Sequence, residues 1–266
     1  MRIHIYLILI AAFMLSSCNS EVAQEDTWQL VWSDEFDYNG LPDPAKWAYD
    51  LGYIANNEKQ YYTESRLENA RVEDGYLIIE ARKEAWEDFD YTSARLVTRD
   101  RQTWTYGRFE VRAKVPTGRG TWPAVWMLGE NISEVGWPAS GEIDIMEYVG
   151  FDPNRFHGYV HTSAFNHTIG TQKGDSIEFE RPWENFHLFA IEWFEDRIDF
   201  FVDDIKYFTF KKESSDDDVW PFDKPHYLLL NLAIGGNWGG QEGIDDSLFP
   251  HQFVVDYVRI YQKEGR

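Results

Sequence analysis

Apolar and polar residues alternate strictly in the segment TYGRFEVRAKVP, residues 105–116. The two sides of the alternation are Phe109, Val111, Ala113 and Val115, and Arg108, Glu110, Arg112 and Lys114. A period of two predicts a β-strand with one face in a core and the other facing polar surroundings. No segment of comparable length repeats its apolar residues with the 3.6-residue period of an amphipathic helix. The chain is therefore expected to fold from strands.

Turn residues divide the remaining sequence into short strands. ARVEDGYLIIEARK, residues 70–83, has a Glu-Asp-Gly turn between two β-rich runs, and residues 191–210 form successive hairpins with turns at Glu195-Asp196 and Asp203-Asp204. QFVVDYVRIYQ, residues 252–262, is typical of a closing strand, and the acidic run KKESSDDDVWP is expected to be a solvated loop. Short strands with frequent turns predict an all-β, single-domain β-sandwich.

The N-terminus has the features of an export signal. MRIHIYLILIAAFMLSSCNS begins with a cationic Arg2, continues with an apolar stretch from Ile3 to Leu15, and ends in LSSC, which resembles a bacterial lipobox. We expect residues 1–17 to be a lipoprotein signal peptide, Cys18 to be lipidated, and residues 18–27 to be an acidic tether. An ordinary signal peptide with an incidental cysteine is the alternative. The expected location is the outer membrane or cell surface.

The charge of the chain restricts its partners. The formal net charge is −21, and cleavage before Cys18 would make it −22 because Arg2 is lost and no acid is. Such a field repels nucleic acid and anionic lipid, so contact with a membrane is expected only through the lipid anchor. A neutral ligand is compatible with this charge. Twelve tryptophans exceed what a core usually needs and fit a groove that stacks flat apolar ligands.

Three acids lie close together in GEIDIMEYVG, residues 141–150. Glu142 and Asp144 are two apart and share a face of an extended strand, but Glu147 is five positions from Glu142 and would face the other side. A β-bulge at Ile145-Met146 would shift the parity by one and return Glu147 to the face of the other two. The spacing therefore allows one row of three carboxylates, provided that the strand is bulged.

Such a row suits retaining glycoside hydrolysis. This reaction needs two carboxyl groups about 5–5.5 Å apart, one ionised as nucleophile and one protonated as acid and then base. A shorter aspartate between them can hold the nucleophile and separate the two protonation states. A solvated acidic face and a calcium site are the alternatives that the spacing alone leaves open.

WPASGEIDIMEYVG, residues 137–150, resembles the signature of the bulged, laminarinase-like branch of glycoside hydrolase family 16. The stretches 56–84, 91–98, 106–129 and 228–240, together with VVDYVRIYQ, are similar to that branch in the same order. The resemblance implies a catalytic domain over residues 28–264, folded as a concanavalin A-like jelly roll with a concave substrate groove. It also implies an endo-glucanase acting on neutral β-1,3-glucan or mixed β-1,3/1,4-glucan, with no cofactor for catalysis. We expect the protein to be a monomer.

The resemblance assigns roles residue by residue. Glu142 matches the nucleophile, Asp144 its assisting acid and Glu147 the acid/base. The positions that match sugar-binding residues are Asn56, Arg95, Trp122, Trp126, Trp137, His161, Asn231 and Trp238. Of these, Trp122 is expected to face the cleft, Trp126 to be partly core, and His161 to lie near the acid/base. A structural Ca²⁺ is implied on Glu35, the backbone of Gly75, and Asp256.

One departure from the family pattern concerns the substrate. Ile54-Ala55 precede Asn56 where the family has Trp-Gly, so one sugar-stacking surface is absent. Two further functions remain open: an agarase-like galactan hydrolase of the same family, and a non-catalytic glycan-binding lipoprotein. The negative charge disfavours sulfated galactans, and the complete set of three acids disfavours a purely binding role.

Overall fold

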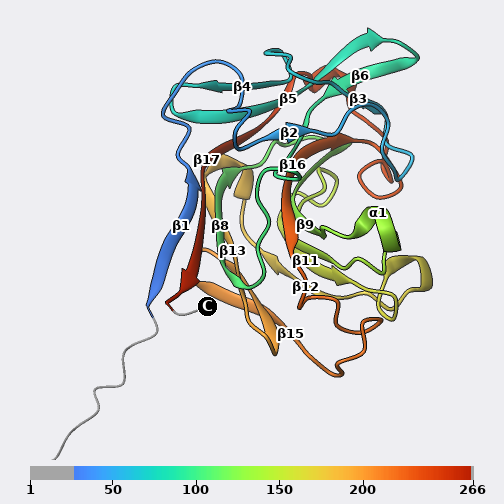
Figure 1. Ribbon diagram of the computed structural model, residues 1–266. Helices are drawn as coiled ribbons and strands as arrows, with labels where there is room; N and C mark the ends of the chain where they lie inside the picture. The colour runs from blue at the N-terminus through green and yellow to red at the C-terminus, as the bar shows by residue number, and fades with distance from the viewer. Residues whose placement is uncertain (1–26, 265–266) are drawn as a thin grey trace, which may run out of the picture.

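Two β-sheets packed face to face make up the part of the chain that the computed structural model describes, residues 27–264 (Figure 1). The alternating segment forms strand β8, Gly107–Lys114, in which every second side chain is buried as predicted. β8 lies between two long strands in the interior of the larger sheet. Its apolar side therefore faces the second sheet, and its charged side faces outward.

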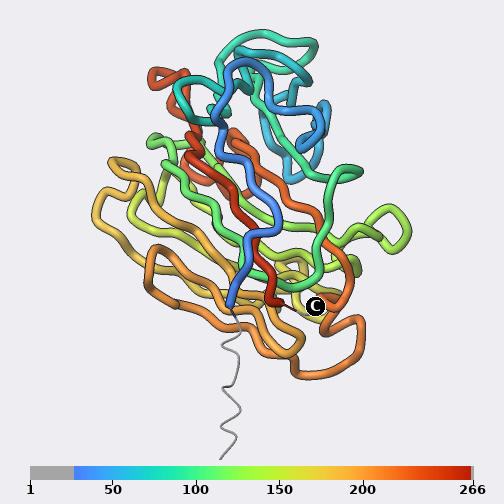
Figure 2. The backbone as a smooth tube through the Cα atoms, turned by 60° about the vertical axis from the view of Figure 1, so that its left-hand side comes forward, coloured from blue at the N-terminus to red at the C-terminus, as the bar shows by residue number. Residues whose placement is uncertain are grey.

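The larger sheet has ten strands and forms the outer layer. Its continuous path runs β15-β14-β13-β8-β17-β5-β6-β3, with β1 paired to β17 and β4 paired to β5. The strands are β1 Trp28–Asp34, β3 Gln60–Tyr62, β4 Ala70–Glu73, β5 Tyr76–Trp86, β6 Phe89–Ser93, β8 Gly107–Lys114, β13 His187–Trp193, β14 Arg197–Val202, β15 Ile205–Lys211 and β17 His251–Lys263. Strands from both ends of the chain thus lie side by side in the outer layer, as Figure 2 shows for the blue and red segments.

The smaller sheet has seven strands in the order β12-β11-β10-β9-β16-β7-β2. They are β2 Ala48–Tyr49, β7 Arg95–Val97, β9 Thr121–Gly129, β10 Glu142–Glu147, β11 Arg155–His161, β12 Lys173–Glu178 and β16 His226–Ile234. The described residues contain one α-helix of a single turn, α1 Ile132–Val135, and 3₁₀ turns at His167–Ile169, Pro182–Glu184 and Asp246–Leu248. None of the described helices has the length and apolarity that crossing a membrane would require.

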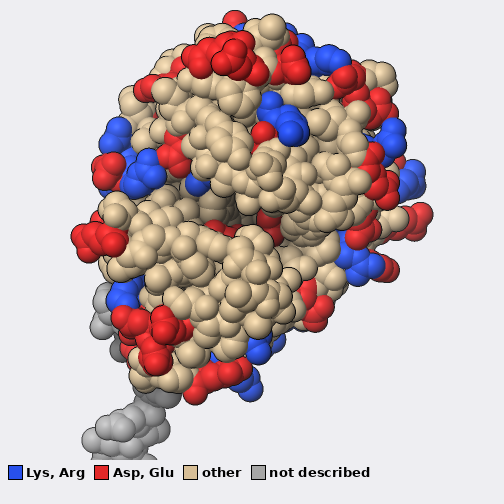
Figure 3. All heavy atoms as spheres, turned by 90° about the vertical axis from the view of Figure 1, so that its right-hand side faces the viewer, with Lys and Arg blue, Asp and Glu red and all other residues tan. Residues whose placement is uncertain are grey.

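The main core fills the space between the two sheets. It contains side chains from both layers, among them Phe109 and Trp193 of the outer sheet and Met127 and Leu230 of the inner sheet, all at most 1% exposed. The opposite face of the inner sheet is left open to solvent. Figure 3 shows that face with a hollow in its middle: acidic atoms are visible at the bottom, and the rim is mostly uncharged. The sandwich with its concave groove is thus confirmed.

The predicted turns are also confirmed, with one correction. Asp74 and Gly75 both have positive φ, 53° and 81°, in a two-residue turn that joins β4 to β5. β13, β14 and β15 form the successive hairpins. The acidic run after β15 is exposed only as far as Asp218, because Trp220 is fully buried and stacks on Phe210. Its end therefore belongs to the core and is not a solvated loop.

The N-terminal predictions fall almost entirely outside the described residues. These are the signal peptide at residues 1–17, the lipidated Cys18, and the tether at residues 18–27, of which only residue 27 is described.

Candidate active site

The register of β10 contains the predicted bulge. Glu142 and Asp144 lie opposite Leu128 and Trp126 of β9, but the next pairs join Met146 to Val125 and Glu147 to Ala124. The pairing with β11 also shifts after Asp144, between Asp144 and Glu147. The extra residue restores the parity, so Glu147 shares a face with Glu142 and Asp144.

Burial on the other side of β10 confirms this geometry. Ile143, Ile145 and Met146 are each 0% exposed and belong to the main core. Two consecutive side chains, Ile145 and Met146, therefore point inward. The three acids are left on the open face, in a row, on a strand that has hydrogen-bonded neighbours on both sides.

Each outer acid of the row accepts a hydrogen bond from a tryptophan. Trp137 Nε1 donates to Glu142 Oε2 at 3.0 Å, and Trp122 Nε1 donates to Glu147 Oε1 at 3.0 Å. An indole N–H can only donate, so it stabilises a carboxylate and orients it. Trp122 therefore lies beside Glu147 on the open face, and Trp137 lies beside the predicted nucleophile.

His161 lies beside the row of acids, on the neighbouring strand β11. It lies opposite Glu142 on β11, with its Nε2 3.3 Å from Asp144 Oδ2 and 3.7 Å from Glu142 Oε1. His157 is the cross-strand neighbour of Glu147, but His161 is also close enough to Glu147 for its charge to act on that acid and lower its pKa. His161 can thus act electrostatically on all three acids of the row.

Burial and mutual repulsion raise the pKa values of the three acids. The pKa of Glu142 is raised to about 8, first by burial and then by the charge of Asp144. The same two causes raise the pKa of Glu147 to about 8, and burial raises the pKa of Asp144. Because three adjacent carboxylates cannot all ionise at low cost, the row retains protons near neutral pH. A site that holds both a carboxylate and a carboxylic acid is what acid-assisted displacement requires.

A chain of hydrogen bonds supports the neighbouring part of the groove. Trp126 Nε1 donates to Asn231 Oδ1 at 2.7 Å, and Asn231 Nδ2 donates to the Tyr62 hydroxyl at 3.1 Å. The Tyr62 hydroxyl in turn donates to Glu58 Oε2 at 3.2 Å. Trp126 is half-buried against a small cluster that includes Leu128 and Leu229, as expected for a partly core residue. Asn231 is only 6% exposed because it lies between Trp126 and Tyr62, and its hydrogen bond holds the Trp126 indole in place.

Arg95 also contacts Trp126, through the face of the indole ring. Its guanidinium is centred 4.5 Å from the Trp126 ring, and Nε is 3.1 Å from Asp50 Oδ2. Arg95 is opposite Asn231 in the strand register, which places it on the open face of the sheet. Both residues therefore belong to the same stretch of the groove wall, as the resemblance implied.

A second cluster of aromatic side chains lies around Glu147. Trp238 contacts Trp122 edge to face with ring centroids 5.7 Å apart, and it contacts His157 at 4.9 Å. The loop carrying Trp238 is joined to Asn56, whose carbonyl oxygen accepts from Asn237 N at 2.7 Å. The structure thus brings Asn56 and Trp238 together near Glu147, the predicted acid/base.

Sequence analysis did not identify Glu58. It is 8% exposed, accepts hydrogen bonds from Gln60 and Tyr62, and has a pKa raised by burial. Its charge is one of the causes that raise the pKa of Glu147. Glu58, Gln60 and Tyr62 alternate in sequence, and this pattern alone could have indicated a shared polar face.

The predicted calcium ligands are engaged by arginines. Glu35 accepts two hydrogen bonds from Arg259, at 3.0 and 2.8 Å, and Arg259 lowers the pKa of Glu35. Asp256 forms an ion pair with Arg112. Gly75 lies in the turn before β5. With a guanidinium on each acid, these residues as arranged do not fit a dication. Among the described residues, the acid and histidine groups that could converge on a metal are Glu142, Asp144 and His161, within the row of acids itself.

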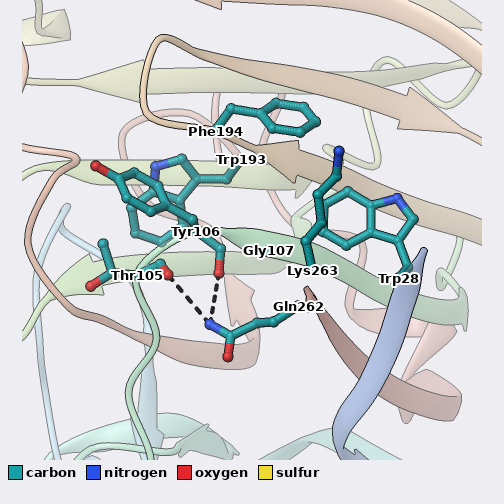
Figure 4. A pocket seen from close by; sticks show the side chains of 8 residues that line it. All are labelled: Trp28, Thr105, Tyr106, Gly107, Trp193, Phe194, Gln262 and Lys263. Atoms are coloured by element: carbon teal, nitrogen blue, oxygen red, sulfur yellow. Dashed lines mark hydrogen bonds between the residues drawn. The ribbon is translucent and has the colours of Figure 1, made fainter. Parts of the chain in front are cut away.

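A crevice beside the two ends of the described chain carries no site. It holds about 20 Å³, room for one water, and Figure 4 shows Trp28 and Lys263 on one side of it and Trp193 and Tyr106 on the other. A sugar ring does not fit there.

The fold and the row of acids define a glycoside hydrolase. The model of glycosyl hydrolases family 16 matches residues 57–259, and the chain belongs to this family. It is 55% identical over 264 residues to a β-glucanase of Rhodothermus marinus, covering 96% of this chain and 92% of the relative.

Solved structures show the same family relationship. The X-ray structure of the laminarinase from Rhodothermus marinus superposes with a TM-score of 0.87 at 56% identity, covering 89% of this chain and 98% of that one. A variant of SCLam, a non-specific endo-β-1,3(4)-glucanase of family GH16, superposes with a TM-score of 0.85 at 48% identity, covering 89% and 95%. That variant was co-crystallised with a glucan oligosaccharide, part of which lies at its active site. The laminarinase-like branch and the jelly roll are confirmed.

Proposed function

We propose that this protein is a retaining endo-β-glucanase that hydrolyses internal bonds of β-1,3-glucan, of mixed β-1,3/1,4-glucan, or of both. The bulge that places Glu142, Asp144 and Glu147 on one face of the groove carries the proposal. The similarity to laminarinases and to an endo-β-1,3(4)-glucanase supports the substrate class. The open hollow in Figure 3 supports internal cleavage, because a long chain can enter it from the side.

The first step forms a glycosyl-enzyme. The Glu142 carboxylate attacks the anomeric carbon, and the bond from that carbon to the glycosidic oxygen breaks. Glu147 gives its proton to the leaving oxygen, which becomes a hydroxyl of the departing glucan. The raised pKa of Glu147 suits this role, because the acid must still hold its proton at the working pH.

The second step releases the sugar. Glu147, now a carboxylate, takes a proton from water, and the water oxygen attacks the anomeric carbon. The ester bond to Glu142 breaks, and Glu142 returns to its carboxylate form. Two displacements at the same carbon retain its β-configuration.

Asp144, His161 and Trp137 can each favour ionisation of Glu142. Burial raises the pKa of Asp144, so this residue is the natural holder of a proton between the two glutamates. A neutral Asp144 removes a negative charge beside Glu142. His161, 3.7 Å from Glu142, favours the Glu142 carboxylate when it is protonated, and Trp137 does so through its hydrogen bond.

The assignment of nucleophile and acid/base can be tested by azide rescue. In Glu142→Ala, azide should attack an activated aryl β-glucoside directly and give an α-glycosyl azide. In Glu147→Ala, azide should attack the glycosyl-enzyme and give a β-glycosyl azide. The opposite stereochemistry would exchange the two roles, and rescue of neither variant would contradict double displacement at these residues.

The substrate class is tested with wild-type protein. Laminarin and barley β-glucan should release reducing ends, with long products appearing early because cleavage is internal. The Glu142→Gln variant should bind both polymers and cleave neither. Cleavage of agarose in place of these two glucans would favour the galactan alternative.

The N-terminal sequence supports an exported, cell-surface lipoprotein whose only membrane attachment is a lipid on Cys18. Cys18→Ser should then move the protein from the membrane fraction to the soluble fraction, and retention in the membrane would contradict the anchor. Size-exclusion chromatography should show a monomer. The calcium site is not part of the proposal, because Arg259 and Arg112 engage its predicted ligands. An EDTA-induced fall of the Tm would reverse that conclusion.

A further inference from the structure

A second open cavity lies beside the catalytic groove. It has a volume of about 330 Å³, at the lower end of the range for small-molecule sites. Its lining combines the loop before β3 with the end of the β5–β6 turn and the first residues of β6, at the top of Figure 1. The lining residues are Tyr53, Asn57, Glu58, Lys59, Asp88, Phe89, Asp90 and Tyr91. The three acids of β10 and the tryptophans that bind them are not among these residues.

Aromatic rings form one wall of this pocket. Tyr53 is 50% exposed and stacks on Phe89 with ring centroids 6.5 Å apart and an interplanar angle of 25°. Phe89 is in turn supported by Tyr61, whose ring contacts it edge to face at 5.5 Å. A β-glucose ring has flat faces of C–H groups that pack on such rings. An exposed aromatic wall held from behind is suited to that contact.

Polar groups stand around the aromatic wall. Within residues 27–264, the side chains of Asp88 and Asp90 have no hydrogen-bond or ion-pair partner, and both are exposed. Their carboxylates are free to accept hydrogen bonds from sugar hydroxyls. Lys59 also lines the pocket. It adds a hydrogen-bond donor, and its positive charge disfavours the binding of a cation. The acids of this pocket do not converge on a point as metal ligands would, since the described residues form such a cluster only at Glu142, Asp144 and His161.

The pocket and the groove share one loop. Asn57, in the pocket, donates from Nδ2 to Asn237 Oδ1 at 2.8 Å, and Asn237 N donates to the carbonyl oxygen of Asn56 at 2.7 Å. Asn237 precedes Trp238, which packs on Trp122 in the groove. One face of the loop thus contacts the groove wall, and its other face lines the pocket.

We propose that this pocket binds a glucosyl unit of the β-glucan polymer outside the catalytic groove. The proposal rests on the proposed function, because it assigns the same polymer to a second place on the surface. The pocket would retain a long chain or a branch of it near the groove between cuts. Short oligosaccharides, which fill only the groove, would not use the pocket.

The test measures binding and turnover separately. In the inactive Glu142→Gln background, Tyr53→Ala and Phe89→Ala should each weaken binding to laminarin about tenfold, equivalent to about 1.4 kcal/mol, in affinity electrophoresis. In the active background, the same substitutions should leave kcat/KM unchanged on a soluble β-1,3-linked trisaccharide and lower it on laminarin.

Two controls accompany these variants. Tyr53→Phe keeps the ring, removes only the hydroxyl that accepts from Asn57 N at 3.1 Å, and should keep most of the affinity. Tyr76→Ala removes a half-buried aromatic that stacks on Phe186 and does not line the pocket, and it should have no effect. Unchanged affinity for laminarin in both alanine variants would overturn the proposal, and so would an equal loss on the trisaccharide, which would assign the residues to the groove. If the proposed function itself were wrong, wild-type protein would cleave neither substrate.

Discussion

Deleting Met146 should remove the bulge of β10 and still leave the three acids on one face. The strand would then read Glu-Ile-Asp-Ile-Glu, in which the last acid is four positions from the first and keeps its parity without an extra residue. Glu147 would remain opposite Ala124 and next to Trp122. We therefore expect the deletion variant to retain measurable activity on laminarin.

The cost of the deletion is an empty space in the core. Met146 is 0% exposed in the main core, and loss of a fully buried Met side chain typically costs about 2–5 kcal/mol. At roughly 2–4 °C per kcal/mol for a chain of this size, the Tm should fall by roughly 4–20 °C. Met146→Ala, which keeps the bulge, should lose a similar amount and serves as the control.

Activity and Tm are to be measured on the same preparations, with reducing ends from laminarin below the Tm of the weaker variant. A deletion variant that folds with the Tm of Met146→Ala but has no activity would refute the parity argument. Loss of activity in both variants to the same degree would instead indicate that core packing, and not strand parity, positions Glu147.

Three further predictions concern protons and buried polar groups. Trp122→Phe removes the N–H that favours the Glu147 carboxylate, so the pKa of Glu147 should rise. The alkaline limb of the kcat/KM profile should then move to higher pH, and an unmoved limb would contradict this role of Trp122. Glu147→Gln should raise the Tm relative to wild type at pH 8 and have little effect below pH 4.5. The reason is that the pKa of Glu147 is about 8 in the folded state and 4.5 in the unfolded state, so the wild-type native state loses stability as the pH rises from 4.5 to 8. A smaller Tm gain at pH 8 than at pH 4.5 would contradict this raised pKa. Tyr62→Phe removes a hydroxyl that links Glu58 to Asn231, and should lower the free energy of unfolding by about 1–3 kcal/mol in urea titrations; no change would mean that water replaces the hydroxyl.

The parts of the site that follow from local periodicity could be predicted from sequence. The spacing from Glu142 to Glu147 has the wrong parity for a regular strand, and a bulge is the local irregularity that corrects it. The alternation in residues 105–116 likewise determined which side chains of β8 are buried. Both inferences need only the geometry of one strand.

The contacts that depend on distant segments could not be predicted in this way. Tyr62 and Asn231 are 169 residues apart, and their hydrogen bond exists only because β3 of the outer sheet and β16 of the inner sheet approach each other. The placement of His161 beside Glu142 follows from the register between β10 and β11, which the sequence pattern does not encode. The arginine on Glu35 is 224 residues away from it, so a calcium ligand and an ion-pair partner could not be distinguished by local pattern.

The catalytic carboxylates stand on β10, which is bordered by β11 and β9, while Asn56 and Trp238 stand on loops at the margin of the sheet. Backbone amides of a doubly paired strand exchange their hydrogens slowly, and those of loops exchange fast. The row of acids therefore lies on the slowly exchanging part of the groove, while Asn56 and Trp238 lie on a part that exchanges fast. Substitutions in these two loops can change contacts at the rim of the groove while the strand that holds the acids stays paired on both sides.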